Sequence, residues 1–72
     1  MPYSVVLFHS ISAALRAEKL LKGNSVAVKP ISIPRHLSSD CGICLRFERS
    51  EEAQVRMILQ RCGVDIQGIH PV

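Results

Sequence analysis

The sequence predicts an α+β fold of the ferredoxin-like type, β-α-β-β-α-β, with a four-stranded antiparallel sheet and two helices on one face. Short β-prone runs alternate with two stretches whose apolar residues recur at helical spacing. Each helical stretch ends in residues typical of a helix C-terminus. Because two right-handed β-α-β crossovers place both helices on the same side, the order of elements determines the arrangement. The 72 residues are expected to form a single domain, residues 1–72.

The first predicted strand and helix occupy the N-terminal third of the chain. Residues 3–8 form a continuous β-prone run, as expected for a central strand. Ser10 or Ser12 can cap a helix that runs to about Lys22. Gly23-Asn24 is expected to close it, because both residues tolerate the left-handed conformation. The apolar stripe of this helix consists of Ala13, Ala14, Ala17, Leu20 and Leu21.

Two further strands are predicted around a long loop. Residues 26–31 read as a strand at the edge of the sheet, because Pro30 cannot donate a ladder hydrogen bond. The loop over 34–42 follows, and residues 43–47 then alternate with period two, as in a half-buried strand. The sheet face without helices is expected to carry Ser4, Val6, Phe8, Cys44 and Arg46.

The last predicted helix and strand complete the order. Ser50 is expected to cap the helix, and Glu51 and Glu52 in its first turn are favoured by the helix dipole. Gly63 occupies the position of a C-terminal glycine cap. Residues 64–67 alternate in polarity and predict a short fourth strand. The apolar stripe of this helix consists of Val55, Ile58, Leu59 and Cys62, which predicts that Cys62 is buried.

Composition and charge disfavour several classes of function. The nine Lys and Arg residues exceed the six Asp and Glu residues by three, but they are scattered along the chain. No basic run marks a nucleic-acid-binding stripe. No signal peptide precedes the first strand, and no apolar stretch approaches the ~20 residues that span a bilayer. With an odd number of cysteines, three in all, the sequence predicts a cytoplasmic protein with reduced thiols and no membrane partner.

The segment from Ile33 to Cys44 holds the candidate chemistry. It contains two of the three cysteines in the longest stretch without helical or strand periodicity. Nearby basic side chains favour a thiolate, which is the reactive form of cysteine, so Cys41 is the predicted reactive residue and is expected to be partly exposed. Its neighbours supply cationic groups, hydroxyl donors and a glycine that lets a partner come close. These supporting residues are Arg35, His36, Ser38, Ser39, Gly42 and Cys44.

The same segment leaves other interpretations open. Cys41-Gly42-Ile43-Cys44 matches Cys-x-x-Cys, so the two cysteines could form a redox pair if a bulge at Gly42 brought them together. A metal would be held by Cys41 and Cys44 with His36 or His9. A structural zinc site usually needs four ligands, so neither a metal nor a cofactor is expected. Cys41 could also be a small packing residue at the start of a strand.

A series of short motifs resembles a known family. Ser-Ser-x-Cys-Gly, followed by Leu-Arg-Phe, is the most specific part, and the resemblance covers nearly the whole chain. It resembles a small bacterial family of selenium/sulfur carrier-like proteins. The motifs, in order, are Phe8-His9-Ser10, residues 14–21, Pro34-Arg35, residues 38–42 and Leu45-Arg46-Phe47. The resemblance implies a carrier that holds a persulfide or selenosulfide on Cys41.

The leading interpretation is a carrier rather than an enzyme with its own turnover. The resemblance implies a cysteine desulfurase-like protein as the sulfur or selenium donor, and a second protein as the acceptor. One alternative is a non-catalytic ferredoxin-like interaction or ligand-sensing module. Such a module would form a homodimer through the apolar centre of the open sheet face. The other alternative is a thiol-disulfide protein that uses Cys41 and Cys44.

Overall fold

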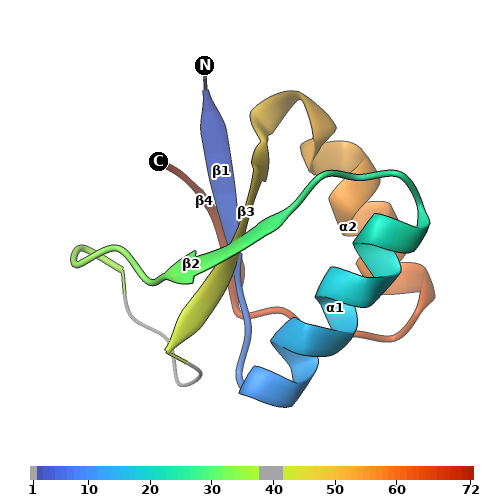
Figure 1. Cartoon of the computed structure of the whole chain (residues 1–72), viewed down its shortest axis with the longest axis horizontal. Helices are drawn as coiled ribbons and strands as arrows, with labels where there is room; N and C mark the ends of the chain where they lie inside the picture. The colour runs from blue at the N-terminus through green and yellow to red at the C-terminus, as the bar shows by residue number, and fades with distance from the viewer. Residues whose placement is uncertain (1, 38–41) are drawn as a thin grey trace.

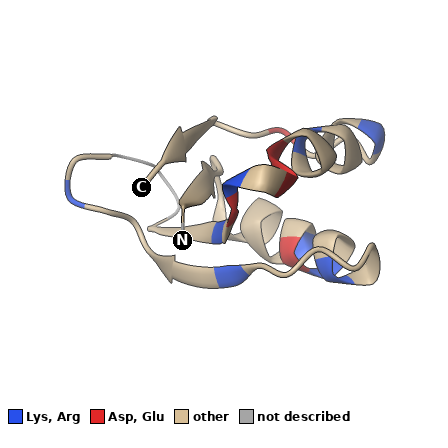
Figure 2. Ribbon diagram, turned by 90° about the horizontal axis from the view of Figure 1, so that it is seen from above, with Lys and Arg blue, Asp and Glu red and all other residues tan. Residues whose placement is uncertain are grey.

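The computed structural model describes residues 2–37 and 42–72 and confirms the predicted α+β fold (Figure 1). In these two ranges, four strands form one antiparallel sheet in the ferredoxin-like order β2-β3-β1-β4. Both helices cover the same face of the sheet (Figure 2). The elements are β1 (Tyr3–Leu7), α1 (Ile11–Gly23), β2 (Lys29–Ser32), β3 (Ile43–Glu48), the 3-10 turn η1 (Arg49–Glu51), α2 (Glu52–Arg61) and β4 (Gly68–Pro71).

The register of the central strands decides which side chains face the helices. Val6 of β1 lies opposite Leu45 of β3 and Ile69 of β4, and this row points to the helices. We call this side the helix face. The other side is the open face, and it carries the side chains of Tyr3, Val5, Leu7, Lys29, Ile31, Cys44, Arg46, Glu48 and His70.

The predicted composition of the open face was therefore wrong for β1. Val6 and Phe8 are fully buried among the helices instead of lying beside Cys44 and Arg46. Ser4 is also fully buried, and it lies opposite Phe47 on the helix face. The cause is that β1 is apolar on both sides, so its periodicity does not identify a face. Only its pairing with β3 does so, and a slip by one residue exchanges the faces.

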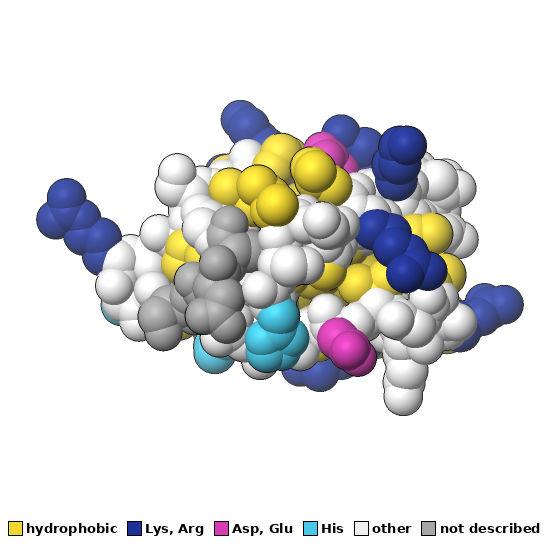
Figure 3. Space-filling model, turned by 90° about the horizontal axis from the view of Figure 1, so that it is seen from below, with side chains coloured by type: hydrophobic (Ala, Val, Ile, Leu, Met, Phe, Trp, Pro, Cys, Tyr) yellow, Lys and Arg dark blue, Asp and Glu magenta, His cyan; other side chains and the backbone are white. Residues whose placement is uncertain are grey.

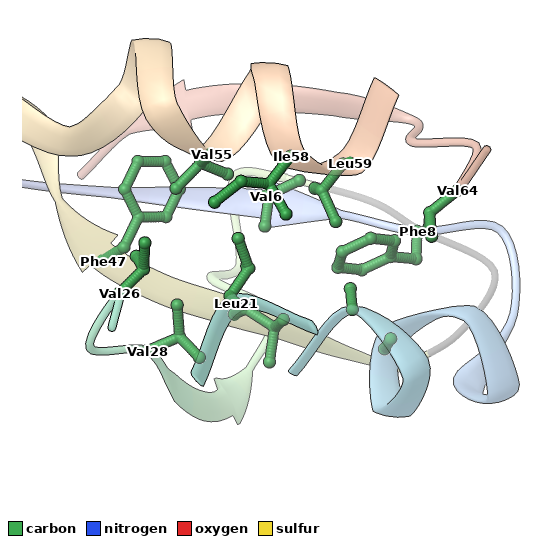
Figure 4. Packing of buried hydrophobic residues seen from close by; sticks show 13 residues of the cluster. Val6, Phe8, Leu21, Val26, Val28, Phe47, Val55, Ile58, Leu59 and Val64 are labelled. Atoms are coloured by element: carbon green, nitrogen blue, oxygen red, sulfur yellow. The ribbon is translucent and has the colours of Figure 1, made fainter. Parts of the chain in front are cut away.

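The main core fills the space between the sheet and the two helices. Leu21 of α1 and Val6 of β1 lie between the rings of Phe8 and Phe47 (Figure 4). Thirteen buried residues belong to this cluster, and they come from β1, β3, both helices and the segments after the helices. The predicted stripes are confirmed at Ala14, Ala17, Leu21, Val55, Ile58 and Leu59, which are all buried.

The two ends of α1 are fixed by local hydrogen bonds. The Ser10 side chain accepts from the Ala13 N–H at 3.2 Å, which confirms Ser10 as the N-cap. At the other end, the N–H of Val26 donates to the Leu21 carbonyl at 2.9 Å, as in a Schellman motif. The left-handed residue there is Ser25, at φ +64°, and not Gly23 or Asn24 as predicted. Asn24 instead donates from its side chain to the Leu20 carbonyl.

The start of α2 differs from the prediction, whereas its end agrees. Ser50 does not cap the helix, because it lies inside η1 and α2 begins only at Glu52. The 3-10 turn carries the chain out of β3 before the α-helix begins. At the C-terminus, Gly63 has φ +69° and the Val64 N–H donates to the Leu59 carbonyl at 2.9 Å. Gly63 is therefore the predicted glycine cap.

Both outer strands lie further along the chain than predicted. β2 begins at Lys29 rather than at residue 26, and the buried Val26 and Val28 belong to the segment before it. β2 is at the edge of the sheet, as Pro30 predicts. β4 covers Gly68–Pro71 instead of 64–67. The alternation in 64–67 arises because Val64 and, in part, Ile66 pack against the core from a connecting segment.

Apolar side chains also remain on the surface. Ile11 and Leu15, one turn apart on α1, are each 52% exposed. Figure 3 views the end of the molecule at which α1 begins and shows exposed apolar side chains grouped there. No helix in the described ranges has the length and apolar character needed to cross a bilayer.

Candidate functional site

The segment after β2 folds back over the open face. Ile33 and Leu37 pack against the buried side chains of Val5, Leu7 and Cys44, together with Ile31 of β2. The Leu37 N–H donates to the Pro34 carbonyl at 2.9 Å, which closes a tight turn. We call residues 33–37 the arm. The arm covers the apolar half of the open face, so the side chains of Val5, Leu7 and Cys44 are buried there. The predicted homodimer stays a prediction.

Three of the predicted site residues lie in a stretch that the structure does not describe. Ser38, Ser39 and Cys41 fall outside the described residues, as does Asp40. Their predicted roles stay predictions. The residues on either side are described: Leu37 packs on the sheet, and Gly42 comes directly before β3. The candidate stretch is therefore bracketed by two residues whose positions are known.

Gly42 has a left-handed backbone at the entrance to β3. It is exposed, its φ is +79°, and a Cβ added to it would meet no described atom within 4 Å apart from those of its chain neighbours. Glycine adopts this left-handed backbone without steric cost. The backbone at the entrance to β3 is consequently open to another molecule.

Arg35 and His36 occupy the turn of the arm. Both side chains are exposed, and the turn lies away from the sheet (Figure 1). Neither side chain forms an ion pair with another residue in the described ranges. The guanidinium and imidazole groups are thus available to bind an anion at this end of the molecule.

The two described cysteines differ in accessibility. Cys44 is 0% exposed, lies beneath the arm, and has its Sγ 4.0 Å from the Ser32 carbonyl oxygen. Cys62 is only half-buried, because it lies at the C-terminal cap of α2. Its carbonyl accepts a hydrogen bond from the Arg16 side chain at 3.1 Å. The prediction that Cys62 is buried therefore holds only in part.

The predicted alternative metal ligands differ in accessibility. His9 follows β1 and His36 lies in the arm, and both are exposed, whereas Cys44 is fully buried. Cys41 lies outside the described residues. Within residues 2–37 and 42–72, no group of three or more histidine, cysteine or acidic side chains could hold a metal ion.

Sequence reasoning missed a second feature, at the polar half of the open face. The Arg46 guanidinium lies over the Tyr3 ring, 4.5 Å from its centroid. Lys29 and Glu48 lie beside this pair. A pocket of about 210 Å³ is lined by Tyr3, Ala27, Val28, Lys29, Arg46, Phe47 and Glu48. The residues are far apart in the sequence, so only the strand register could have indicated their proximity.

A comparison with protein-family models gives one result for this chain. The family described as "Putative Se/S carrier protein-like" matches residues 3–71. The chain belongs to this family. No curated protein and no solved structure matches the chain.

The family match confirms the resemblance found in the sequence. In this Se/S carrier-like protein the matched range starts at the first residue of β1 and ends at the last residue of β4. The complete sheet, both helices and the arm therefore fall within the matched range, as does the segment around Cys41.

Proposed function

We propose that this protein carries sulfur or selenium as a persulfide or selenosulfide on Cys41, between a donor protein and an acceptor protein. The family description supports the carrier class. The proposal places the protein in the reducing cytoplasm, where thiols persist. A cysteine desulfurase-like protein is the donor.

The proposed transfer needs only an accessible thiolate and two partners. The Cys41 thiolate attacks the outer sulfur of a persulfide on the donor. A new S–S bond forms on Cys41, and the donor cysteine leaves as a thiolate. A nucleophile on the acceptor then attacks the outer sulfur, and the Cys41 thiolate is regenerated as the leaving group. Electrons balance over the two steps, so no cofactor or external oxidant takes part.

The accessibility of the chain next to Cys41 is the observation that carries the proposal. Gly42 is exposed, and no described residue other than its chain neighbours fills the space where a side chain would be, which favours the approach of a partner to the backbone there. Cys44, by contrast, is closed off beneath the arm. A thiol that exchanges sulfur between two proteins has to be reached by each of them in turn.

The basic residues of the arm support the same role. Arg35 and His36 are exposed and precede Cys41 by six and five positions. A persulfide anion on Cys41 would be stabilised by a nearby guanidinium or imidazole donor. Ser38 and Ser39 would add hydroxyl donors.

The test is intact-protein mass spectrometry after incubation with a cysteine desulfurase and cysteine, and separately with an inorganic polysulfide. The wild type should gain one sulfur atom that dithiothreitol removes. Cys41→Ser should gain none, whereas Cys44→Ala and Cys62→Ala should behave as the wild type. Retention of the added sulfur by Cys41→Ser and its loss in Cys62→Ala would assign the carrying thiol to α2 and overturn the proposal.

A further inference from the structure

A row of side chains crosses the polar half of the open face from one edge of the sheet to the other. Across the strands β2, β3, β1 and β4, the row consists of Lys29, Arg46, Val5 and His70, each paired with the next. Strands in a sheet are about 4.8 Å apart, so the row is about 14 Å long. The arm packs over the apolar part of this face, which is formed by Val5, Leu7 and Cys44, whereas Lys29 is exposed and Arg46 is half-buried outside that cluster.

The cationic end of this row is held in place. Arg46 is half-buried and stacks on the Tyr3 ring at 4.5 Å. Arg49 donates from Nη2 to the Tyr3 carbonyl at 3.3 Å, so a second guanidinium is fixed at the same strand. A side chain that is already ordered loses less conformational entropy when it binds a ligand. The contacts with Tyr3 therefore order the Arg46 and Arg49 guanidinium groups before an anion binds.

The cations of the row are not neutralised by ion pairs within the described residues. The ion pairs found there, Lys22–Glu18 and Arg56–Glu52, both lie along the helices. Glu48 brings a carboxylate to this region. It lies opposite Tyr3, one row away from Arg46, and its side chain is exposed. The region around the pocket thus combines Lys29, Arg46 and Arg49 with the Glu48 carboxylate.

We propose that this surface, formed by Tyr3, Lys29, Arg46, Glu48 and Arg49, is a docking site for an acidic segment of a partner protein. A carboxylate of the partner enters the 210 Å³ pocket, which Lys29 and Arg46 help to line. Guanidinium groups bind carboxylates with directional, charge-assisted hydrogen bonds.

The arrangement favours a protein partner over a nucleic acid. Single-stranded nucleic acids bind through several aromatic side chains on which bases stack. Tyr3 is the aromatic side chain of this surface, and Arg46 already covers its ring. The exposed Glu48 carboxylate also repels the phosphates of a nucleic acid, whereas a peptide can place its carboxylates to either side of it.

The proposed surface is close enough to the entrance of β3 for one partner to contact both places. Gly42 and Arg46 are four residues apart along the chain, which corresponds to about 13 Å in an extended strand. A standard protein interface buries about 800 Å² on each partner and is wider than this distance. The docking proposal does not depend on the chemistry of Cys41.

The experiment measures the fluorescence anisotropy of a fluorescein-labelled deca-glutamate peptide at about 50 mM salt, where exposed charges are weakly screened. The wild type should bind the peptide. Lys29→Gln and Arg46→Gln should each weaken binding by about three- to fivefold, and Glu48→Gln should strengthen it by about twofold. Lys29 is exposed, so Lys29→Gln is expected to stay folded and to report the loss of one cation even if Arg46→Gln unfolds.

The matched control is Lys19→Gln, which removes the same charge from the exposed surface of α1 on the other side of the sheet. It should change the affinity by less than half as much as Lys29→Gln. Three results would overturn the proposal: no binding to the wild type, equal losses for Lys19→Gln and Lys29→Gln, or tighter binding of a deca-thymidine oligonucleotide than of the peptide.

Discussion

The two faces of the same four-stranded sheet are covered in different ways. The helix face is covered by two helices and contributes to a cluster of thirteen buried residues. Of the residues that the structure describes, the open face buries Val5, Leu7 and Cys44, beneath an arm of irregular structure. A helix is held by its own hydrogen bonds and by many apolar contacts, whereas the arm is held by a few side chains. Segments with few buried contacts open at the lowest cost, and they are where proteins usually place their binding and reacting groups.

The largest expected effect is on the helix face. Leu21→Ala removes a fully buried side chain of α1 from the centre of the main core, between Phe8 and Phe47 (Figure 4). We expect the free energy of unfolding to fall by about 2–5 kcal/mol, as measured by urea denaturation. The control is Leu15→Ala on the same helix, which is 52% exposed in the wild type and should change stability by about 0.5 kcal/mol or less. Equal losses for both would mean that the packing of α1 against the sheet does not determine stability.

A smaller effect is expected on the open face, where accessibility should change more than stability. Leu37→Ala removes the contact that joins the end of the arm to Cys44. The free energy of unfolding should fall by about 1 kcal/mol, because Leu37 is only half-buried. The alkylation rate of Cys44 under native conditions should rise about fivefold, since a loss of about 1 kcal/mol favours a local opening that exposes its sulfur by that factor. The measurement is iodoacetamide labelling followed by peptide mass spectrometry, in a Cys41→Ser, Cys62→Ala background.

A control from the other face separates local from global opening. Ile66→Ala truncates a half-buried side chain that packs against the main core. Its cost in stability should be similar to that of Leu37→Ala. If Ile66→Ala accelerated the alkylation of Cys44 as much as Leu37→Ala, the sulfur would become exposed through global unfolding. The distinction between the two faces would then fail.

The same difference explains how much of the fold could be predicted from the sequence. The helices were predictable because periodicity reports the face of an isolated element, and Ser10 and Gly63 carry their own end signals. The face of β1 was not predictable in the same way. Val5, Val6, Leu7 and Phe8 are all buried, so pairing with β3 alone distinguishes the two sides. Period two places Ser4 on the same face as Val6 and Phe8, which was predicted to be the open face; in the structure its hydroxyl is buried without a hydrogen-bond partner among the described residues.

The candidate site shows the same limit. The sequence located the segment around Cys41 and the exposed residues Arg35, His36 and Gly42 from residue types alone. It did not predict that the arm packs on the open face, because Leu37 is a single apolar residue in a polar loop. The proximity of Lys29 to Arg46 likewise depends on strand register, which no local pattern encodes.

The smallest expected effect concerns the ends of the two helices that cover the helix face. Both helices end in the same Schellman motif. The Val26 N–H donates a hydrogen bond to the Leu21 carbonyl in α1, and the Val64 N–H donates one to the Leu59 carbonyl in α2. The left-handed position is Gly63 in α2 but Ser25, at φ +64°, in α1. A residue with a Cβ is strained in this conformation, whereas glycine is not. We therefore expect Ser25→Gly to raise the free energy of unfolding by about 0.5–1 kcal/mol, and the reciprocal Gly63→Ser to lower it by a similar amount, in urea denaturation.

Neither variant touches the arm, so the native-state alkylation rate of Cys44 should stay at the wild-type value in both. A slower rate in Ser25→Gly would show that Cys44 is reached by global unfolding, and it would contradict the local opening expected for Leu37→Ala. A stabilisation without a change in that rate would show that the two faces of this sheet are governed by separate sets of contacts.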